Sequence, residues 1–539
     1  MNNAVRQAPA PLIAVGLVLI ILLTVVIRLG LVDVPLERDE GEYAYGGQLI
    51  LQGRLPYQQM HSMKLPGIYM VYACMLAMLG QTHQAIHLGL VAVNAATILL
   101  VFLLARRLYD PLAGMGAAAF FAVLSLMPSV QGISANAEHF VVLLALGGLY
   151  LLLRALEEKQ PAILFLSGLL LGFGFLIKQH TAVFILFGGI YILYDLFCRR
   201  PVKWPTAIAR TGLFILGAGL PYGMTCLFFM YAGSFDKFWF WTFEYARTYS
   251  KQMPIQTGWY LFGKNSFAIL KSAPLIWLLF FIGVVTLWGQ QQPKPRSAFA
   301  GMLLAFSFLA TSIGFFFRPH YFILLLPASA ILAGVSLSAI QMRLLKNHSI
   351  AIKYGFMLLM AGIFVFVSLY QHRKLLFQMT PQQVARAIYG LNPFPEAPEV
   401  ARFVAANTQA DDRIAVLGSE PEIYYYSRRR SAANYIYMYP LMEGHRYALE
   451  MQREMAEQIE SARPKVLIIV NVPTSWLKTG DSHSFIMTWM RKYQAENFTL
   501  VGIVDIYQHD SKYHWTPEVN WPPDSADWIA IFKRNNHGP

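Results

Sequence analysis

The chain has 539 residues, of which 56% are hydrophobic and 14% are charged, and its mean hydropathy is +0.43. This composition excludes an ordinary soluble domain and is typical of a protein with many membrane spans. The formal net charge is +13, but the basic residues stand in short connections between apolar segments, where they report orientation in the bilayer and do not indicate a nucleic-acid partner. The three cysteines, Cys74, Cys198 and Cys226, lack metal-ligand spacing, so neither a disulfide framework nor a metal cluster is expected.

Eleven apolar windows are long enough to cross roughly 30 Å of hydrocarbon as helices. They lie at residues 11–31, 84–105, 111–128, 135–155, 161–177, 180–198, 206–232, 272–290, 297–317, 320–341 and 350–371. A twelfth apolar piece, residues 68–79, is short and follows Lys64 and Pro66 closely. We expect this piece to lie in the interface or to re-enter, because a full span there would reverse the charge asymmetry of all later loops.

The basic residues between the spans predict the orientation of the chain. With residues 68–79 in the interface, the basic loops all fall on the side of the N-terminus, which the positive-inside rule assigns to the cytoplasm. These residues are Arg106, Arg107, Arg154, Lys159, Arg199, Arg200, Lys203, Lys294, Arg296, Arg343 and Lys346. The opposite, extracytoplasmic face collects residues 32–83, residues 233–271 and everything after about residue 372. We therefore predict a multi-pass protein of the cell inner (plasma) membrane whose C-terminal part is periplasmic.

From Thr380 the composition turns mixed and polar. Segments rich in β-branched residues alternate with helical stretches, which predicts a small α/β domain. The predicted strands are residues 413–418, 465–472, 499–506 and 528–534, and the predicted helices are near residues 396–407, 447–462 and 483–493. We predict two domains, a membrane domain at 1–375 and an extracytoplasmic α/β domain at 376–539. No GxGxxG motif or P-loop follows the strands, so nucleotide binding is not supported.

The stretch LERDEGEYAY, residues 36–45, follows the first span and gathers acidic side chains at the membrane boundary. On a helix that begins near Asp39, the side chains of Asp39, Glu42 and Tyr43 share one face. Single carboxylates there would simply favour the positive end of a helix. A cluster of them beside the hydrocarbon, with Lys64 in the same loop, is costly to retain without a role. We interpret the cluster as part of a functional site.

These residues resemble a known family. The stretches RDEGEYAYGGQLILQGRLPY and MKLPGIYMVYACMLAMLG resemble the first extracytoplasmic loop of the GT-C membrane glycosyltransferases, above all the bacterial relatives of protein O-mannosyltransferases and of the lipid A aminoarabinose transferase. Those enzymes use an Asp-Glu pair after the first span and a Lys-x-Pro just before an interfacial helix. This chain has Asp39-Glu40 and Lys64-Leu65-Pro66. Later segments, SANAEHF, LIKQHTAVF and RPHYFILLLP, agree in layout, so the likeness covers about residues 10–375.

The resemblance implies a polytopic α-helical protein of the GT-C fold that transfers a hexosyl or pentosyl group from a polyprenyl-phosphate donor. The implied acceptor is extracytoplasmic: lipid A or another glycolipid, a polysaccharide or a protein. By their match to the family positions, Asp39 is the implied catalytic carboxylate and Glu40 supports it. The leaving group is a lipid phosphate, so positive side chains should neutralise the charge it gains. Lys64, Lys178 and Arg318 stand on the predicted face and are the candidates for that contact.

Four further residues are candidates for substrate binding. Glu42 and Tyr43 share the helix face of Asp39, and His320 lies near the same predicted surface. Glu138 either holds sugar hydroxyls or acceptor, or caps the next span. His320 and His180 without a carboxylate at fixed spacing do not make a metal site. No cofactor is predicted, and the participation of a divalent cation stays open.

Two aromatic stretches each have two interpretations. FWFWTFEYARTY, residues 238–249, is either a belt at the headgroup level or a platform for stacking sugars. EPEIYYYSRRR, residues 420–430, is either an acceptor surface or a strand with a solvated edge.

Features of the sequence distinguish two rival functions from the implied sugar transfer. A lipid-linked sugar carrier or flippase should place ionisable residues along a path through its spans, whereas here the ionisable groups gather on one face. An O-antigen polymerase or ligase tends to rely on arginine and histidine in a large loop, and the early carboxylate pair argues against it.

Overall fold

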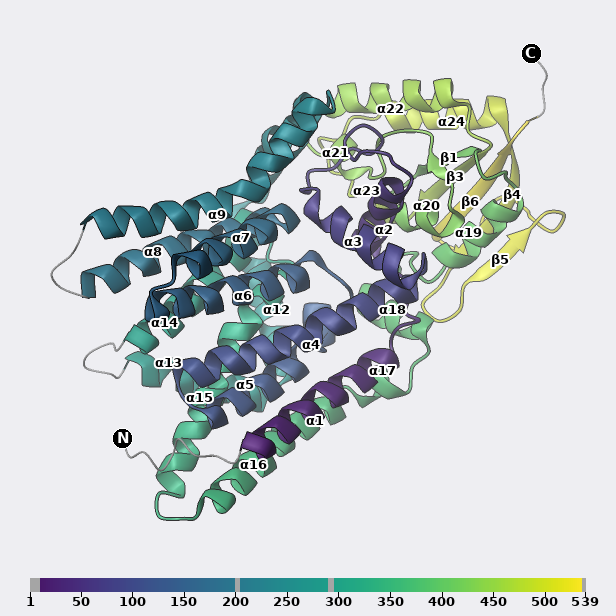
Figure 1. Cartoon of the computed structure of the whole chain (residues 1–539). Coiled ribbons are helices and arrows are strands. Elements are labelled where there is room, and N and C mark those ends of the chain that lie inside the picture. Colours follow the sequence, from purple (N-terminus) through teal and green to yellow (C-terminus); the bar gives the residue numbers. More distant parts are fainter. Residues whose placement is uncertain (1–9, 199–203, 289–294, 536–539) are drawn as a thin grey trace.

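The computed structural model describes residues 10–198, 204–288 and 295–535 (Figure 1). A bundle of long apolar helices forms one part, and an α/β domain built on a six-stranded sheet forms the other. The sheet domain sits at one end of the bundle, and helix α1 begins at the opposite end (Figure 1). Of the basic residues used above to predict orientation, Arg199, Arg200, Lys203 and Lys294 lie outside the described residues.

A helix occupies each of the eleven predicted windows. These helices are α1 (Ala10–Leu29), α4 (His83–Leu108), α5 (Pro111–Leu124), α6 (Ala137–Glu158), α7 (Pro161–Ile177), α8 (Ala182–Cys198), α9 (Trp204–Tyr231), α13 (Pro274–Trp288), α14 (Pro295–Ser312), α15 (Leu326–Leu344) and α16 (Ile350–Gln371). Within the described residues, eight helical segments are long and apolar enough to cross a membrane unaided, and a bent pair, α12 (Ile255–Ser272) with α13, brings the number to nine. Helices α5 and α7, with 14 and 17 residues, are shorter than a standard span. The mostly helical membrane fold is thus confirmed.

Small residues bring the helices of the bundle into close contact. At the crossing of α7 and α9, a Cβ atom on Gly168 would lie 2.2 Å from the carbonyl oxygen of Phe214, and a Cβ on Gly217 would lie 2.3 Å from that of Phe165. Any larger side chain at either glycine would push the two helices apart. Close backbone approach of this kind replaces the hydrophobic effect as the source of helix association within lipid.

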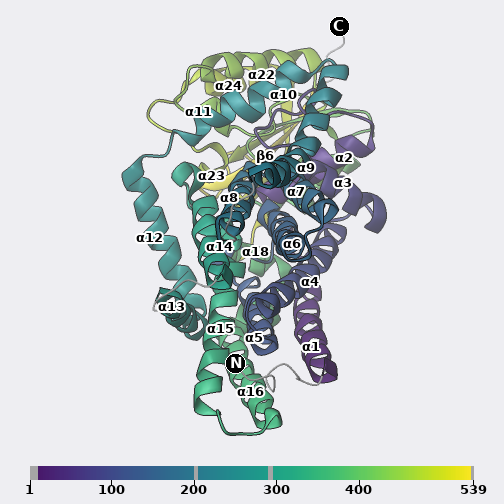
Figure 2. The ribbon, with the colours of Figure 1, turned by 60° about the vertical axis from the view of Figure 1, so that its left-hand side comes forward.

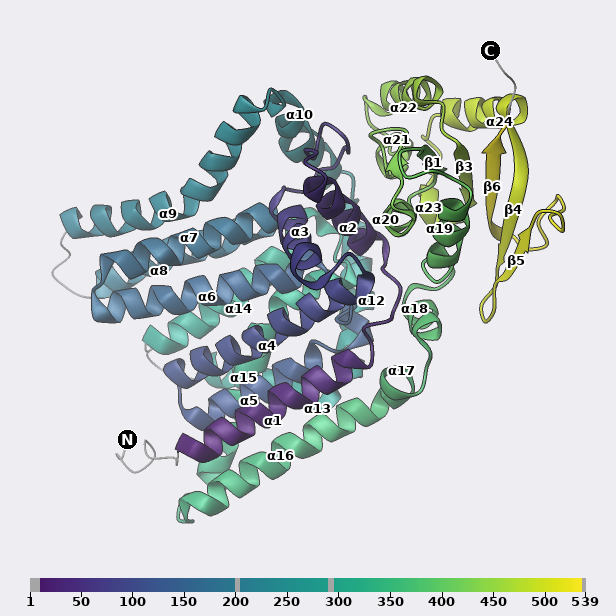
Figure 3. The same ribbon diagram turned by 45° about the vertical axis from the view of Figure 1, so that its right-hand side comes forward.

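Helices α2 (Arg38–Leu51) and α3 (Gly67–Leu79) connect α1 to α4 at the sheet end of the bundle (Figure 3). Helix α3 has 13 residues, so it spans only about 20 Å. Arg106 and Arg107 stand in the last turn of α4 and Arg343 in the last turn of α15, at the end of the bundle far from the sheet (Figure 3). This arrangement agrees with an interfacial α3 and with basic loops that share one side.

Between α9 and α13 the chain forms a series of shorter helices. These are α10 (Phe235–Trp239), the π-helical segment η4 (Phe240–Tyr245), α11 (Ala246–Ser250) and α12. The first three lie against the sheet domain, whereas α12 and α13 meet at an angle of 110° at the side of the bundle (Figure 2). The remaining short elements are η2 (Pro128–Val130), η3 (Gln179–Thr181), η5 (Ile313–Phe315), η6 (Pro319–Leu325), α17 (Arg373–Phe377), α18 (Pro381–Tyr389), α21 (Tyr439–Met442) and α23 (Pro473–Trp476).

The sheet has the strand order β2-β1-β3-β6-β4-β5. Its strands are β1 (Arg413–Leu417), β2 (Arg430–Ser431), β3 (Val466–Asn471), β4 (Phe498–Ile506), β5 (Lys512–Trp515) and β6 (Asp527–Arg534). Strand β1 pairs in parallel with β2 and β3, and the other pairs are antiparallel. The main helices of the domain are α19 (Ala397–Ala406), α20 (Pro421–Ser427), α22 (Ala448–Ala462) and α24 (Phe485–Asn497). The four predicted strands are confirmed to within one residue at each end, and the short strands β2 and β5 were not predicted.

The stretch 420–430 differs from both of its interpretations. It forms helix α20 and not a strand, and Tyr424 and Tyr425 are buried, so these rings do not make an exposed acceptor surface. The helix packs on α2, where a Cβ atom on Gly41 would lie 2.7 Å from the Cβ atom of Glu422. Helix α20 is therefore part of the joint that fastens the sheet domain to the first loop of the membrane bundle.

Candidate active site

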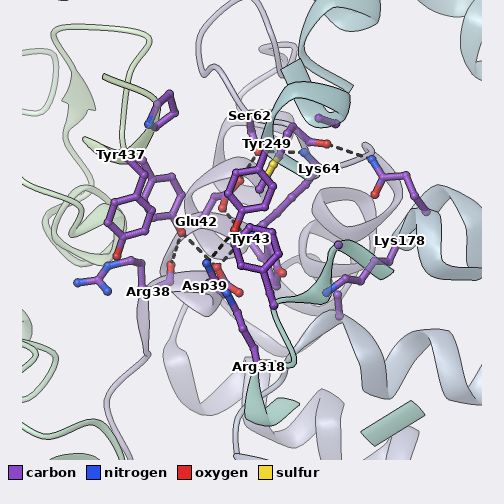
Figure 4. Close-up of a pocket in the computed structure, with 18 of the residues that line it drawn as sticks. Arg38, Asp39, Glu42, Tyr43, Ser62, Lys64, Lys178, Tyr249, Arg318 and Tyr437 are labelled. Atoms are coloured by element: carbon purple, nitrogen blue, oxygen red, sulfur yellow. Dashed lines mark hydrogen bonds and ion pairs between the residues drawn. The ribbon is translucent and has the colours of Figure 1, made fainter. Parts of the chain in front are cut away.

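A cavity of about 600 Å³ lies where the helical bundle meets the sheet domain (Figure 4). Its walls come from parts far apart in the sequence: the start of α2, the loop before α3, η3, the η4–α11 segment, η6 and residues 435–443. Seven of the nine predicted site residues line it, namely Asp39, Glu42, Tyr43, Lys64, Lys178, Arg318 and His320. The two others, Glu40 and Glu138, lie outside its lining.

Helix α2 begins at a capping box that places Asp39 in the first turn. The carboxylate of Glu37 accepts a hydrogen bond from the backbone N–H of Glu40 at 3.1 Å, and the carboxylate of Glu40 accepts one from the N–H of Glu37 at 3.2 Å. This reciprocal pair satisfies two backbone donors at the helix start. A carboxylate in the first turn also interacts favourably with the positive end of the helix dipole.

The ammonium group of Lys64 bridges two carboxylates of α2 (Figure 4). Its Nζ lies 2.7 Å from Oδ1 of Asp39 and 2.6 Å from Oε2 of Glu42, and it lies 4.5 Å from the ring centroid of Tyr43. Glu42 is fully buried and also accepts hydrogen bonds from the hydroxyls of Ser62 and Tyr69, each at 2.6 Å. The Lys-x-Pro motif therefore supplies a fixed cation to the acidic start of α2.

The charges around Asp39 decide its protonation. Burial alone raises the pKa of Asp39, but the positive charges of Lys64 and Arg318, together with His320, outweigh it and hold the pKa below its usual value. Burial lowers the pKa of Lys64, but Asp39 and Glu42 more than offset this and raise it. Both groups are therefore ionised near neutral pH.

Arg318 is a cation of the cavity that is not directly paired with a carboxylate in the described part of the chain. Its Nη2 donates a hydrogen bond to the hydroxyl of Tyr249 at 2.9 Å, and its guanidinium lies 5.7 Å from the ring centroid of Phe316. Among the described residues it forms no ion pair, whereas Lys64 forms two. A half-buried guanidinium with unused donors is suited to bind an anion such as a phosphate.

Lys178 and Glu138 form an ion pair beside the cavity. The ammonium of Lys178 donates to Oε1 of Glu138 and lies 4.1 Å from the ring centroid of Tyr321. Glu138 is fully buried, and its second carboxylate oxygen has no hydrogen-bond partner. Lys178 is the member of this pair that lines the cavity, so Glu138 reaches a bound molecule only through it.

His320 lies between Asp39 and the loop before α6. Its Nε2 is 3.9 Å from Oδ2 of Asp39, and its Nδ1 is 2.9 Å from Oε1 of Gln131. The imidazole thus lies beside Oδ2 of Asp39, whereas Lys64 binds Oδ1. His180, the other histidine considered above, also lines the cavity, and both of its ring nitrogens are buried without a hydrogen-bond partner.

Glu40 points away from the cavity into the helical bundle. Its Oε1 accepts a hydrogen bond from the backbone N–H of Ala135 at 2.5 Å and lies 3.1 Å from Nε2 of His87. It is 1% exposed. The Asp-Glu pair is thus split: Asp39 faces the cavity, and Glu40 ties α2 to the membrane helices.

Several cavity residues lie outside the nine predicted site residues. The stretch 238–249 lines the cavity through Trp241 and Tyr245 among others, which an aromatic belt at the headgroup level does not explain. The sheet domain contributes Tyr435, Tyr437 and Glu443. Nothing local marks these positions, because an isolated tyrosine or glutamate carries no signal of the surface it will face.

One group of side chains in the described part of the chain is close enough to share a metal ion. Asp505, His514 and Asp524 bring their ligand atoms within 4.8 Å of one another on the sheet domain. None of the three lines the cavity. In the cavity itself the ammonium of Lys64 lies between the two carboxylates that would otherwise attract a cation, so its donor set does not favour a metal.

Comparisons with solved structures identify the class of fold. ArnT from Cupriavidus metallidurans bound to undecaprenyl phosphate aligns with a TM-score of 0.55 and 14% identity, covering 96% of this chain and 97% of that one. The archaeal oligosaccharyltransferase AglB from Archaeoglobus fulgidus, in complex with an inhibitory peptide and a dolichol-phosphate, aligns with a TM-score of 0.56 and 11% identity, covering 94% of this chain and 75% of that one. This chain is a multi-pass membrane protein with the GT-C fold of membrane glycosyltransferases.

The comparisons of sequence match a shorter part of the chain than the comparisons of structure do. A family described as dolichyl-phosphate-mannose-protein mannosyltransferase matches residues 63–224, which begin just before Lys64 and end within α9. No curated protein matches the sequence. Together with the structural matches, this finding confirms the predicted resemblance to the GT-C superfamily.

Proposed function

We propose that this protein is a glycosyltransferase that moves a sugar from a polyprenyl-phosphate donor to an acceptor outside the cytoplasm. One observation carries the proposal: an ionised Asp39, paired with Lys64, shares a cavity with Arg318, a cation that has no carboxylate partner among the described residues. A carboxylate can hold or deprotonate an attacking group, and a cation can stabilise a phosphate that leaves. The cavity contains both groups.

Arg318 is the main proposed contact for the donor phosphate, and Lys64 and Lys178 assist it. Arg318 has guanidinium donors to spare, whereas each lysine already serves a carboxylate. As the bond between the sugar and the phosphate breaks, the phosphate gains negative charge, and fixed cations lower the energy of that state. These groups need no rearrangement of solvent, because the cavity walls already hold them in place.

The donor's isoprenoid chain is proposed to lie in a second cavity of about 740 Å³ between α12, α13 and α14. Its walls are almost entirely apolar, and Phe322 and Leu325 of η6 contribute to them. The same short helix presents His320 and Tyr321 to the first cavity. Because η6 borders both spaces, a phosphate at Arg318 would have its lipid chain directed toward this apolar surface.

Asp39 is proposed to act on the acceptor. A hydroxyl oxygen attacks the anomeric carbon, its proton passes to Asp39, and the bond from that carbon to the phosphate oxygen breaks, so that the phosphate keeps the electron pair. At rest Asp39 is a weak base, because Lys64 lowers its pKa. A donor phosphate competes with Asp39 for Lys64, so donor binding makes Asp39 a stronger base. An acceptor that is itself an anionic phosphate would need Asp39 only for orientation.

The acceptor is proposed to enter between the membrane bundle and the sheet domain. Tyr437 and Tyr439 stack with ring centroids 5.5 Å apart on the sheet-domain wall, and Trp241 and Tyr245 stand on the η4 wall. Aromatic faces and hydroxyls of this kind bind carbohydrate rings. The chemistry of the walls is compatible with a glycolipid, a polysaccharide or a protein acceptor on the periplasmic side.

The decisive experiment reconstitutes the purified protein in lipid nanodiscs with a panel of polyprenyl-phosphate sugars and follows release of polyprenyl phosphate. Asp39→Asn should lower kcat by about 10²- to 10⁴-fold, the usual range for a lost catalytic carboxylate. Asp33→Asn is the matched control, because Asp33 is exposed in the same loop and its side chain, among the described residues, bonds only to Gln84. Full activity in Asp39→Asn would exclude the assigned role, and no turnover with any donor would exclude the proposed reaction.

A further inference from the structure

The side chains of three consecutive residues at the start of α2 make contacts in three different parts of the molecule. Arg38 reaches the sheet domain, where its guanidinium lies 3.1 Å from the carboxylate of Glu420. Asp39 faces the cavity, and Glu40 enters the membrane bundle. The direction of Asp39 is therefore set by the anchors on either side of it, and the anchor on the membrane side ends at His87 of α4.

The hydrogen bonds of His87 indicate which of its two ring nitrogens carries a hydrogen. Its Nδ1 lies 2.8 Å from the backbone carbonyl oxygen of Val32, and its Nε2 lies 3.1 Å from Oε1 of Glu40. A carbonyl oxygen can only accept, so Nδ1 carries a hydrogen. A neutral imidazole has a single N–H, which leaves Nε2 facing the carboxylate without one.

The contact between Nε2 and Glu40 is satisfied only by an additional proton. Either the imidazole is doubly protonated, or the carboxyl of Glu40 holds the hydrogen and donates it to Nε2. Both states contain one proton more than a neutral histidine with an ionised glutamate. Because Glu40 also accepts from the backbone N–H groups of Glu37 and Ala135, the ionised carboxylate with a charged imidazole satisfies all of these contacts together.

We propose that His87 is a positioning residue for Asp39. It acts through Glu40: the pair of His87 and Glu40 holds one extra proton and fastens α4 to the start of α2, and this pair is called the clamp below. The inference rests on the proposed function, since it assigns a role in the reaction attributed to Asp39. With the proton present, Glu40 is held by His87 and by the N–H of Ala135, whose own carbonyl accepts from Tyr72 at 2.7 Å. Loss of the proton removes the contact with His87 and lets the first turn of α2 shift.

The surroundings of the clamp contain few other charges. Arg28 of α1 lies near it and donates to the carbonyl oxygens of Ser125 and Gly132. His83 lies one turn earlier on α4, with its ring centroid 6.4 Å from that of His87. Two acidic groups lie nearby, as Glu37 caps α2 and Asp33 stands at the surface beside His83. Among these groups, Glu40 is the carboxylate in direct contact with His87.

The activity test compares His87→Gln with His83→Gln in the full-length protein in nanodiscs. His83 is the matched control, since it is half-buried on the same helix and, in the part of the chain that the structure describes, makes no hydrogen bond to Glu40. We expect His87→Gln to lower kcat by about 10- to 100-fold, the effect of a displacement of about 1 Å at a reacting group, with the donor KM changed less than about twofold. The wild type and His83→Gln should lose kcat at alkaline pH as the clamp gives up its proton, and His87→Gln should show a flat profile. An unchanged rate and pH profile in His87→Gln would overturn the proposal.

A second measurement does not depend on turnover. Hydrogen–deuterium exchange of residues 37–43 should become about tenfold faster in His87→Gln and in Glu40→Gln but not in His83→Gln, and the double variant should add little to either single change. If no donor is turned over, the proposed function fails while this measurement still decides the clamp. Unchanged exchange in His87→Gln would refute the clamp even in an active enzyme.

Discussion

The membrane bundle and the sheet domain contribute different chemistry to the same cavity. The bundle and its first loop supply the charges, with Asp39, Lys64 and Arg318 all placed at one end of the helices. The sheet domain supplies mainly phenol rings, such as Tyr437 and Tyr439. Charges near the bilayer are retained where they compensate one another, whereas a water-facing domain can present neutral hydrogen-bonding groups at little cost. Neither region forms the site without the other, and the following substitutions separate their contributions.

The largest expected effect comes from removing the central cation of the bundle. Lys64→Met leaves the carboxylates of Asp39 and Glu42 without their shared partner, and breaking a buried ion pair from one side costs about 3–5 kcal/mol. The free energy of unfolding should fall by that amount, measured by denaturant titration in detergent. Lys374→Met, at an exposed position after α16, should leave it unchanged. Equal stability of the two variants would mean that Lys64 does not organise the start of α2.

Removal of the cation without an ion-pair partner should affect donor binding more than stability. Arg318→Gln keeps a hydrogen-bonding side chain beside Tyr249 but removes the charge. The affinity for undecaprenyl phosphate should fall about 10- to 100-fold, since a hydrogen bond to a charged group contributes about 1.5–3 kcal/mol. Binding is measured by thermal shift in nanodiscs that contain the lipid. Arg373→Gln, which removes a cation that stacks on Tyr370, should bind the lipid as the wild type does.

The smallest effect is expected from the sheet domain. The hydroxyl of Tyr437 donates to the carbonyl oxygen of Arg38 at 3.0 Å and also lies 3.5 Å from Oδ1 of Asp39. Tyr437→Phe removes the neutral bond, which contributes about 0.5–1.5 kcal/mol, together with the longer contact to Asp39. Transfer should slow only a few-fold in a single-turnover assay, with donor affinity unchanged. Tyr513→Phe on the edge strand β5 is the control. A loss as large as that of Arg318→Gln would show that the sheet domain supplies more than neutral contacts.

Much of the fold and part of the site could be predicted from the sequence. Apolar windows placed all eleven helices, and alternating β-branched segments placed four strands, because both patterns arise from neighbours within a few residues. Strand β2, with two residues, is too short to carry a period. Lys64 and Asp39 were predicted for one site from their places in the same loop and from the resemblance to the GT-C family, and the structure places them 2.7 Å apart.

The sequence could not predict that the side chains of Asp39 and Glu40 point in different directions. Adjacent residues on a helix point about 100° apart, so a helix at this position does not by itself say whether one of them or both face a cavity. The structure decides this by the partners that surround the helix, with His87 on one side and Lys64 on the other. Likewise, no local feature of residues 435–443 marks them as a wall of the cavity.

The sequence by itself determined the membrane spans, the start of a helix near Asp39 and the gathering of ionisable groups at one end of the bundle. These properties follow from hydrophobic periodicity, helix capping and the cost of charge in hydrocarbon, which are set over short stretches of chain. Only the tertiary structure decided which carboxylate faces the cavity, that Arg318 lacks an ion-pair partner among the described residues, and that the sheet domain closes over both. The partner of a buried charge is whatever long-range packing brings beside it, and packing joins residues that are hundreds of positions apart.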